Sequence, residues 1–325
     1  MPTRTHILRF VERVRHLPAR PAAFVFPCDR DSLQLAMACA FSGTLAPVLV
    51  GPETRIRDVA ARQSIDLSRL PVVDTADAPR AAAVRAVELA RAGTVGVLVR
   101  GALGNEDLLS PVSAPDSGLR GPHRLSHAHF LDLAGWPNGI LLADAHLNIT
   151  PNLAAKRDIL QNTIAFAHAL GVAVPRVALL AAMDGVNPAF PSTRDAAALT
   201  AMAGQGLFED AVIDGPLAAD SALAEDAAVA NGRRSSVAGH ADVLIAPGME
   251  AALLVLRTLT GLTSGLAAGL VLGARVPIVA PVRTDSMETR MASCVLAALM
   301  AATNTVPGSG KVIVGARAAV AEAGT

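Results

Sequence analysis

Short apolar runs alternate with amphipathic segments through the first third of the chain. Each apolar run is bounded by turn-forming residues, and together they predict strands at residues 22–26, 46–50, 70–73 and 95–99. The amphipathic segments predict helices at residues 31–42, 53–63 and 76–92. Strands separated by helices of this length predict right-handed crossovers, and therefore an α/β fold whose parallel sheet is covered by helices on both faces.

A break in this alternation lies between residues 101 and 124, where Gly, Pro, Ser and Asp become frequent. Such a composition is typical of a boundary between lobes. A second alternating series follows, with strands predicted at residues 177–182, 211–213, 243–246 and 276–279. A chain of 325 residues also exceeds the size at which a single core keeps growing, so we expect two lobes.

Two helices of the second series have recognisable ends. Thr150 is the expected N-cap of the first of them, with Pro151 at its first position, and Gly171 is its expected terminator. Ser192 and Asp195 have the spacing of a capping box and predict the start of the next helix.

Two further segments bear on the question of a membrane. Residues 251–273 are long and apolar enough to suggest a membrane span, but Arg257 and several glycines interrupt them. We therefore predict a buried helix, a turn and a second buried element there, and no membrane partner. Residues 4–15 alternate arginines with apolar residues at helical spacing, which predicts an amphipathic helix and no export signal.

Charge and cysteine content narrow the function classes. The 28 basic and 28 acidic side chains balance, which argues against nucleic acid as the main partner, because phosphate-backbone binding normally requires a basic excess. Cys28, Cys39 and Cys294 lie in apolar surroundings without CxxC spacing. We therefore expect reduced, buried thiols in a cytoplasmic protein.

A polar cluster follows the predicted strand at 276–279. Residues 283–286, Arg-Thr-Asp-Ser, and Glu288 precede an apolar pattern at helical spacing, so a strand, a polar turn and a helix are expected. The backbone N–H groups of a helix N-terminus together with an arginine make an anion site suited to phosphate. The alternative is an ordinary capping turn with a structural Arg–Asp pair.

Other polar groups are weaker indicators of a site. Asp214 to Leu217 follow the predicted strand at 211–213, at a position where open α/β sheets bind ligands. Asp144 and Asn148 form a second such group. Taken alone, each group is most often a turn.

Several common site motifs are absent. The chain contains no GxxxxGK[ST], HExxH, paired CxxC or GxSxG sequence, which disfavours nucleotide-driven, zinc and serine-hydrolase chemistry. His123, His127 and His129 crowd together, but they lack a fourth ligand at a plausible spacing. Surface or strand-face histidines explain them better, and we predict no metal site.

Short motifs spread over nearly the whole chain occur in the order and spacing of one enzyme family. They are LVGP at 49–52, RG at 100–101, LSH at 125–127, AD at 143–144 with Asn148, ILQN at 159–162, AHALG at 167–171, VNP at 186–188, DAAAL at 195–199, DGPL at 214–217, VAG at 237–239, GARVPI at 273–278 and RTDS at 283–286. With these motifs the chain resembles the phosphate acetyltransferase and phosphate butyryltransferase family, closer to the butyryl branch.

The resemblance implies a two-lobed α/β fold like that of the isocitrate and isopropylmalate dehydrogenases, usually as a dimer. Residues 1–118 with 276–325 would form the first lobe and residues 119–275 the second, with the active site in the cleft between them. The implied reaction moves a short-chain acyl group between coenzyme A and inorganic phosphate. Acyl-CoA and phosphate are then substrates, and no bound cofactor is needed.

The resemblance also implies roles for particular residues. Arg283 would bind the anion and stabilise the developing oxyanion, while Asp285, Ser286 and Glu288 would orient it and cap the following helix. Arg100 would make a second phosphate contact. The remaining substrate-binding residues implied in this way are Gly101, Asn105, Asp144, Asn148, Asp214 and Pro216.

The chain departs from the family pattern near these residues. Val282 replaces a serine that meets the thiol of coenzyme A, and the loss of such a hydrogen bond costs roughly 1.5–3 kcal/mol. Thr289 stands where the acetyl branch carries an acidic base, with Glu288 adjacent. In the loop after residue 99, Arg100 replaces a lysine, Gly104-Asn105 replaces a His or Ser followed by Thr, and Ser110 replaces a basic residue.

These departures leave a second hypothesis open. The chain would then be a catalytically reduced family member that binds a coenzyme A derivative or acts as a structural or partner domain. A dehydrogenase of the same fold is a third hypothesis, disfavoured because the metal-binding aspartates and substrate arginines of those enzymes are not recognisable here.

Overall fold

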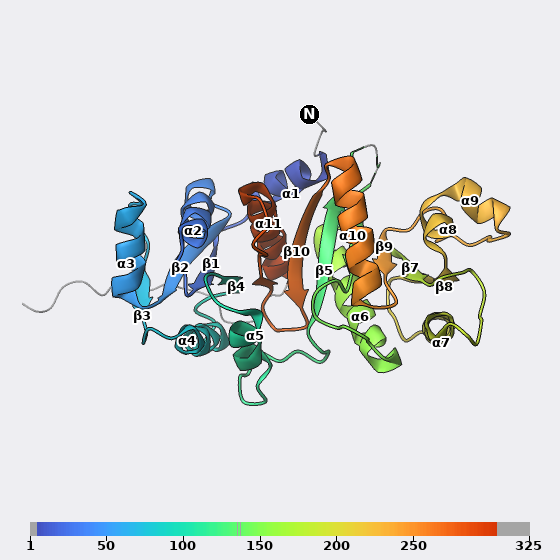
Figure 1. The fold of residues 1–325 in the computed structure, drawn as a ribbon, viewed down its shortest axis with the longest axis horizontal. Helices are drawn as coiled ribbons and strands as arrows, with labels where there is room; N and C mark the ends of the chain where they lie inside the picture. Colours follow the sequence, from blue (N-terminus) through green and yellow to red (C-terminus); the bar gives the residue numbers. More distant parts are fainter. Residues whose placement is uncertain (1–4, 135, 137, 304–325) are drawn as a thin grey trace, which may run out of the picture.

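One mixed sheet of 11 strands runs through the chain in the computed structural model, which describes residues 5–134, 136 and 138–303. The strand order is β3-β2-β1-β4-β11-β10-β5-β6-β9-β7-β8, and helices lie on both sides of the sheet (Figure 1). The α/β fold predicted from the sequence is confirmed.

The first half of the sheet contains five parallel strands, β3, β2, β1, β4 and β11. Its elements are β1 (Arg20–Val25), α2 (Arg30–Ser42), β2 (Leu45–Gly51), α3 (Glu53–Arg62), β3 (Val72–Asp74), α4 (Pro79–Arg91), β4 (Val97–Arg100) and β11 (Ile278–Val279). The predicted strands and helices of the first third of the chain are therefore confirmed, with small shifts at their ends.

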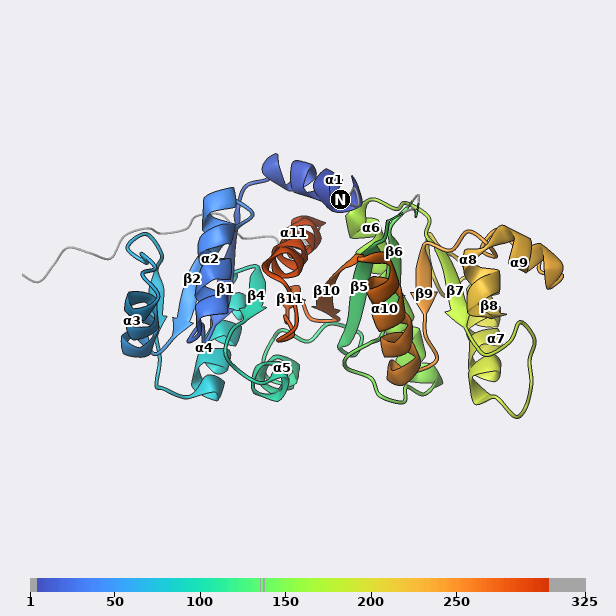
Figure 2. The ribbon, with the colours of Figure 1, turned by 45° about the horizontal axis from the view of Figure 1, so that its top comes forward.

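The second half repeats the parallel arrangement in β6, β9, β7 and β8. Its elements are β6 (Ile140–Ala143), α6 (Leu153–Leu170), β7 (Arg176–Leu180), α7 (Pro191–Gly204), β8 (Val212–Leu217), α8 (Ala219–Leu223), α9 (Glu225–Ala230) and β9 (Val243–Ile245). Figure 2 shows β8, α8 and α9 at the end of the sheet opposite to α3.

Antiparallel strands join the two halves. β10 (Leu266–Leu272) pairs antiparallel with both β11 and β5 (Ser126–Asp132), and β5 pairs antiparallel with β6. The predicted parallel pairing is therefore found within each half, and the sheet is antiparallel at the junction, where the chain direction reverses between the halves.

Two helices tie the halves together. α11 (Met287–Thr303) packs against α2 and β4 of the first half and against α6 and β10. α1 (Thr5–Arg15), the amphipathic helix predicted at the N-terminus, packs on α11 and on β5. The backbone N–H of Ile7 donates to Asp132 Oδ2 over 3.0 Å, and Arg13 Nη2 donates to the Ala169 carbonyl over 3.1 Å.

The predicted helix ends are partly confirmed. Gly171 ends α6 in the left-handed region, with φ 97°, as expected. The N-cap of α6 is Asn152 and not Thr150, because the Asn152 side chain accepts from the Ala155 N–H. The capping box at Ser192 and Asp195 is wrong, since α7 begins at Pro191 and the Asp195 carboxylate instead accepts from Lys156 Nζ over 2.8 Å.

The apolar segment 251–273 has the predicted order of helix, turn and second element, but its helix is only partly buried, since Leu254 and Leu262 are 70% and 82% exposed. It forms α10 (Met249–Thr263), a turn and β10. Among the described residues, no helix is long and apolar enough to cross a membrane. Cys28, Cys39 and Cys294 are free and buried, which confirms the prediction for the thiols.

Candidate active site

The loop after β11 forms the predicted polar turn, and α11 begins directly after it. Asp285 Oδ2 accepts from the Val282 N–H over 2.8 Å, and the Asp285 N–H donates to the Val282 carbonyl over 3.1 Å. Ser286 Oγ accepts from the Thr289 N–H over 3.1 Å and so caps the first turn of α11. The expected order of strand, polar turn and helix is confirmed.

Arg283 is exposed on this turn. Its guanidinium makes no hydrogen bond or ion pair with the part of the chain that the structure describes. The Asp285 carboxylate holds the backbone of the turn and not the Arg283 side chain. The expected Asp285–Arg283 pairing is therefore replaced by a turn that leaves the guanidinium available to a ligand.

Arg100 lies at the end of β4, next to this turn. Its Nη1 donates to the Leu103 carbonyl over 2.7 Å, and its Nη2 donates to the Pro281 carbonyl. Arg100 thus ties the loop after β4 to the loop after β11. Its Nε is buried and has no hydrogen-bond partner among the described residues.

Two other guanidinium groups surround Arg100. Burial lowers the pKa of Arg100, and the positive charges of Arg290 and Arg283 lower it further, against the opposing effect of Asp285 and Asp29. Arg290 is itself anchored, because its Nη2 lies 3.1 Å from Asp31 Oδ2 and its Nε donates to the Asp285 carbonyl over 3.1 Å. Cations gathered in this way favour an anionic ligand.

The loop after β4 has little freedom. A Cβ at Gly101 would lie 2.6 Å from the Phe26 carbonyl oxygen and 2.7 Å from that of Val25, so only glycine fits there. Asn105 is exposed at the first position of α5 (Asn105–Ser113), a helix that the sequence did not predict. Arg100 therefore ends β4, and Gly101 and Asn105 follow it in the segment beside the Arg283 turn.

Asp144 and Asn148 shape the loop that follows β6. Asp144 Oδ1 accepts from the N–H groups of His146 and Leu147 over 2.9 and 3.0 Å, and Oδ2 accepts from Asn148 Nδ2 over 2.6 Å. Asn148 Nδ2 also donates to the Leu125 carbonyl over 3.1 Å. Both carboxylate oxygens of Asp144 are thus engaged within the protein, and the loop is fixed against the start of β5.

Asp214 and Pro216 lie elsewhere. They are part of β8 and not a turn beyond it, and β8 is the edge strand, six strand spacings or roughly 29 Å from β11. Both carboxylate oxygens of Asp214 accept from Arg233 Nη2, over 3.0 and 3.1 Å. The structure therefore does not bring Asp214 and Pro216 together with Arg283.

Three histidine side chains meet on the sheet at the junction. His127 and His129 are two residues apart on β5 and so share one face, with ring centroids 4.4 Å apart. The His146 ring, from the loop after β6, lies 4.9 Å from His127 and 5.1 Å from His129. On β10, a Cβ at Gly269 would lie 2.5 Å from His127 Cε1, so the glycine leaves the space that the rings fill.

Burial keeps this histidine cluster, His127, His129 and His146, neutral. His127 and His129 are 4% and 7% exposed. Burial, with a contribution from the neighbouring rings, lowers the pKa of His127 well below its usual value and that of His129 to about 3. Burial also lowers the pKa of His146, which is half-buried.

The histidine cluster faces the Arg283 turn. Burial raises the pKa of Asp285, while the hydrogen bond from the Val282 N–H and the nearby Arg290, His146 and Arg257 side chains oppose this shift. Extending the strand pairings places Arg100 and His129 in one row across the sheet, three strand spacings or about 14 Å apart. Residues from both halves therefore meet at the junction.

The sequence did not single out His146, Arg257 or Arg290. His127 and His129 were noted as strand-face histidines, and that interpretation is confirmed for both, since they lie on β5. His123 lies outside the cluster, with its Nδ1 3.6 Å from Asp158 Oδ1. Within the described ranges, no group of His, Cys, Asp or Glu side chains has an arrangement that could hold a metal ion.

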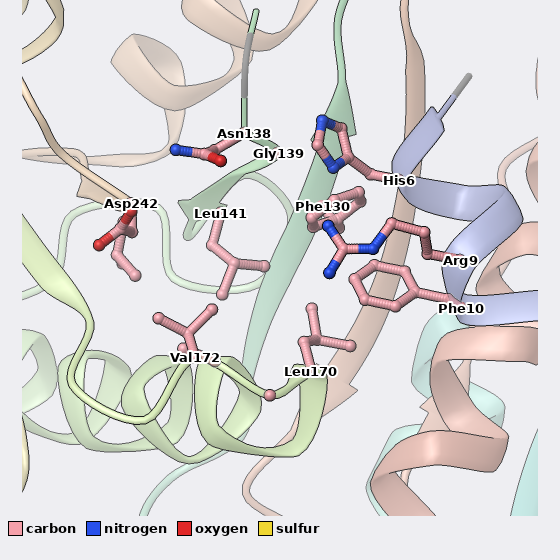
Figure 3. Close-up of a pocket in the computed structure, with 13 residues that line it drawn as sticks. His6, Arg9, Phe10, Phe130, Asn138, Gly139, Leu141, Leu170, Val172 and Asp242 are labelled. Carbon is pink, nitrogen blue, oxygen red and sulfur yellow. The ribbon is translucent and has the colours of Figure 1, made fainter. Parts of the chain in front are cut away.

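A separate cavity of about 310 Å³ lies between α1, the C-terminal end of α6, and strands β5 and β6 (Figure 3). Phe130, Phe10, Arg9 and His6 line one side of it. Phe130 alternates with His129 along β5, so the cavity and the histidine cluster lie on opposite faces of the sheet. This cavity is therefore not part of the junction site.

Fold and site together define a two-part α/β protein with a cationic junction suited to an anionic ligand. A family model described as phosphate acetyl/butaryl transferase matches residues 79–298. The chain therefore belongs to the phosphate acetyl/butyryl transferase family.

Individual relatives agree with this assignment. A phosphate acetyltransferase from Rhizobium meliloti is 46% identical over 276 residues, covering 85% of this chain and 87% of its own length. A phosphate butyryltransferase from Clostridium beijerinckii is 35% identical over 294 residues, covering 90% of this chain and 97% of its own length.

Solved structures agree on the fold. A branched-chain phosphotransacylase from Enterococcus faecalis V583 superposes with a TM-score of 0.76 at 25% identity, covering 87% of this chain and 99% of its own. A 4-hydroxythreonine-4-phosphate dehydrogenase from Klebsiella pneumoniae has a TM-score of 0.56 at 16% identity, covering 88% of this chain and 100% of its own, and it shares the fold alone. The predicted likeness to a two-lobed dehydrogenase fold is confirmed.

Proposed function

We propose that the protein is a phosphate acyltransferase. It exchanges a short acyl group between coenzyme A and inorganic phosphate, giving acyl phosphate and free coenzyme A from acyl-CoA and phosphate. The observation that carries the proposal is the Arg283 guanidinium, which has no hydrogen-bond or ion-pair partner among the described residues. It lies beside Arg100 and Arg290, in a chain of this family. The coenzyme A thioester is a substrate, and no bound cofactor takes part.

The chemistry requires cations more than it requires a nucleophilic side chain. Phosphate attacks the thioester carbonyl, and negative charge develops on the carbonyl oxygen before the sulfur leaves. Arg283 would hold the phosphate and stabilise that oxyanion, and such a preorganised donor contributes about a hundred- to a thousandfold in rate. Ser286 and Asp285 keep the turn that carries Arg283 in place.

The loop after β4 is proposed as the second wall of the phosphate site. Arg100, Gly101 and Asn105 follow one another there, and Asn105 opens a helix of 9 residues whose first N–H groups favour an anion. Glu288 lies in the first turn of α11, and we propose that its negative charge offsets the positive potential at the N-terminus of α11. Asp144 and Asn148 would hold the loop after β6 in place. Asp214 and Pro216 would shape β8, far from Arg283.

The test is direct. Purified protein is expected to release free thiol from acetyl-CoA or butyryl-CoA only when phosphate or arsenate is added. Arsenate is the sharper probe, because acyl arsenates hydrolyse and draw the exchange to completion. No anion-dependent thiol release with either thioester would refute the proposal.

The preferred acyl chain is a finer question. The sequence motifs favour the butyryl branch, whereas the 46% identity to a phosphate acetyltransferase exceeds the 35% identity to a phosphate butyryltransferase. We propose a preference for butyryl-CoA. A higher kcat/KM for acetyl-CoA than for butyryl-CoA would contradict it.

A second candidate function is binding of coenzyme A without turnover. Val282 favours it, because an apolar side chain stands before Arg283 and its backbone N–H is already bound to Asp285. Calorimetry separates the candidates. Tight coenzyme A binding by a protein that releases no thiol would favour the binding protein.

We also propose a homodimer acting in the cytoplasm. α10 carries Leu254 and Leu262 on one side, 70% and 82% exposed, which is costly unless another surface covers them. Light scattering is expected to give twice the chain mass of 33.2 kDa, and Leu262→Glu is expected to give the single mass. A wild-type monomer at micromolar concentration would contradict the dimer.

The lobe boundaries are part of the same proposal. Residues 1–118 with 276–325 would form one lobe and residues 119–275 the other, with the site between them. The antiparallel strands β10 and β5 at the junction, and the convergence there of residues from both halves, support this division.

A further inference from the structure

The histidine cluster is not explained by folding alone. Two buried Nδ1 atoms, those of His127 and His129, have no hydrogen-bond partner among the described residues. Leaving such polar atoms unsatisfied is unfavourable, and apolar side chains in their place would avoid that cost. Imidazoles kept at such a cost, beside the proposed site, suggest a chemical role.

The proposed reaction requires a group that carries a proton, which an imidazole can do. Hydrogen phosphate carries one proton on oxygen, the acyl phosphate dianion carries none, and coenzyme A leaves with a proton on sulfur. One proton must therefore move from the phosphate to the departing sulfur in each turnover. The side chains at the expected thiol positions cannot carry it, because Val282 has no titratable group and the Thr289 hydroxyl is too weak a base at neutral pH.

His146 is the member of the cluster with access to solvent. It is half-buried, whereas His127 and His129 are buried, and it comes from a loop fixed by the Asp144 carboxylate. A neutral imidazole can accept a proton at one ring nitrogen and return it, and histidine is the commonest general acid–base group.

Neutral rings and charged groups of the described residues face His146. His127 and His129 face it from β5, Asp144 from its own loop, Asp285 from the turn after β11, and Arg257 from α10. The two carboxylates stabilise the imidazolium that forms during transfer, and Arg257 and burial return the ring to the neutral state. The surroundings therefore suit a proton carrier and not a permanent cation.

We propose that His146 is the proton-transfer residue of the acyl exchange, and that His127 and His129 position its ring. The phosphate O–H bond breaks as the new C–O bond forms, and the proton passes to an imidazole nitrogen of His146. The C–S bond then breaks, and the same proton passes to the sulfur. No electrons are gained or lost, and no further reactant is required. This inference rests on the proposed acyltransferase function.

The test compares His146→Gln with His123→Gln, a matched control that lies outside the cluster beside Asp158. Phosphate-dependent thiol release is measured from pH 5.5 to 9 for both variants and the wild type. His146→Gln is expected to lower kcat by about a hundred- to ten-thousandfold, to leave KM for acyl-CoA nearly unchanged, and to remove the acid limb of the pH profile. Added imidazole is expected to restore part of the rate. The His123→Gln profile should match the wild type.

The outcomes separate this inference from the function on which it depends. No thiol release by the wild type refutes the acyltransferase function, and the inference with it. Release by the wild type together with an unchanged kcat or an unchanged pH profile in His146→Gln overturns the inference alone. If that variant does not fold, single-turnover rates of the wild type in H₂O and D₂O decide, because equal rates would contradict proton transfer in the chemical step.

Discussion

Burial decides which side chains at the junction carry a charge. It raises the pKa of Asp285 and lowers those of the three clustered histidines, while the guanidinium groups of Arg283 and Arg290 remain beside Arg100. The exposed Arg283 guanidinium places a positive charge on the turn after β11. At the scale of single residues, the junction is therefore built to receive an anion next to neutral proton acceptors.

His129 predicts a pH dependence of stability. Its pKa is about 3 in the folded protein and about 6.5 in an unfolded chain. Between these values the unfolded chain binds the extra proton, so the free energy of unfolding rises with pH and falls on acidification. The expected slope from this side chain is about 1.4 kcal/mol per pH unit below pH 6.5.

Urea unfolding at several pH values measures this slope. His129→Gln should be less sensitive to pH between about 6.5 and 3 than the wild type. His16→Gln serves as the control, because the His16 side chain is 77% exposed and its removal should leave the slope unchanged. A slope in His129→Gln equal to that of the wild type would show that the buried ring is not the cause.

Some of these residues could be predicted from the sequence and others could not. Arg283 stands between an apolar run and a helical pattern, and that local order was enough to predict an anion site. The histidine cluster depends on antiparallel pairing of β5 with β6 and on Gly269, which lies far along the chain. Such convergence leaves no local pattern, so His146 was missed.

Local pattern also explains which secondary-structure elements were found. The alternating strands and helices before residue 100 have uninterrupted apolar faces, and all of them were predicted. β5 was missed because both of its faces are buried and carry polar side chains, His127 and His129 on one face and Asp132 on the other, and α5 was missed because it contains Pro111. Polar groups buried in a strand and a proline within a helix both erase the periodicity on which the prediction depends.

α6 and α7 offer a prediction at the scale of elements. Lys156 of α6 is 8% exposed and lies 2.8 Å from the Asp195 carboxylate of α7. Asp195→Asn would leave a buried ammonium without its counter-charge, so the free energy of unfolding is expected to fall by about 3 kcal/mol. Urea unfolding measures the change.

The matched control is Asp77→Asn. Asp77 pairs with Arg55 over 3.0 Å, but their side chains are 57% and 48% exposed. Loss of this surface pair should cost at most about 1 kcal/mol. Equal losses in the two variants would contradict the view that burial makes the α6–α7 pair important.

The candidate site residues lie where the sheet changes direction, between the two halves of the molecule. β4 and β11 of the first half end beside Arg100 and Arg283, and β5 and the loop after β6 supply the histidine cluster from the other half. A single lobe would contain only one of the two parts. In the proposed function, the junction between the halves is the place where phosphate, thioester and proton carrier would meet.

In the proposed function, Arg283 holds phosphate against the thioester at this junction. The most direct measurement is phosphate-dependent thiol release from acyl-CoA by Arg283→Ala, with Arg234→Ala, an exposed arginine near the far edge of the sheet, as the control. Arg283→Ala is expected to lose at least about a hundredfold in kcat/KM, and Arg234→Ala to match the wild type. Full activity of Arg283→Ala in a protein that releases thiol with phosphate would contradict the claim.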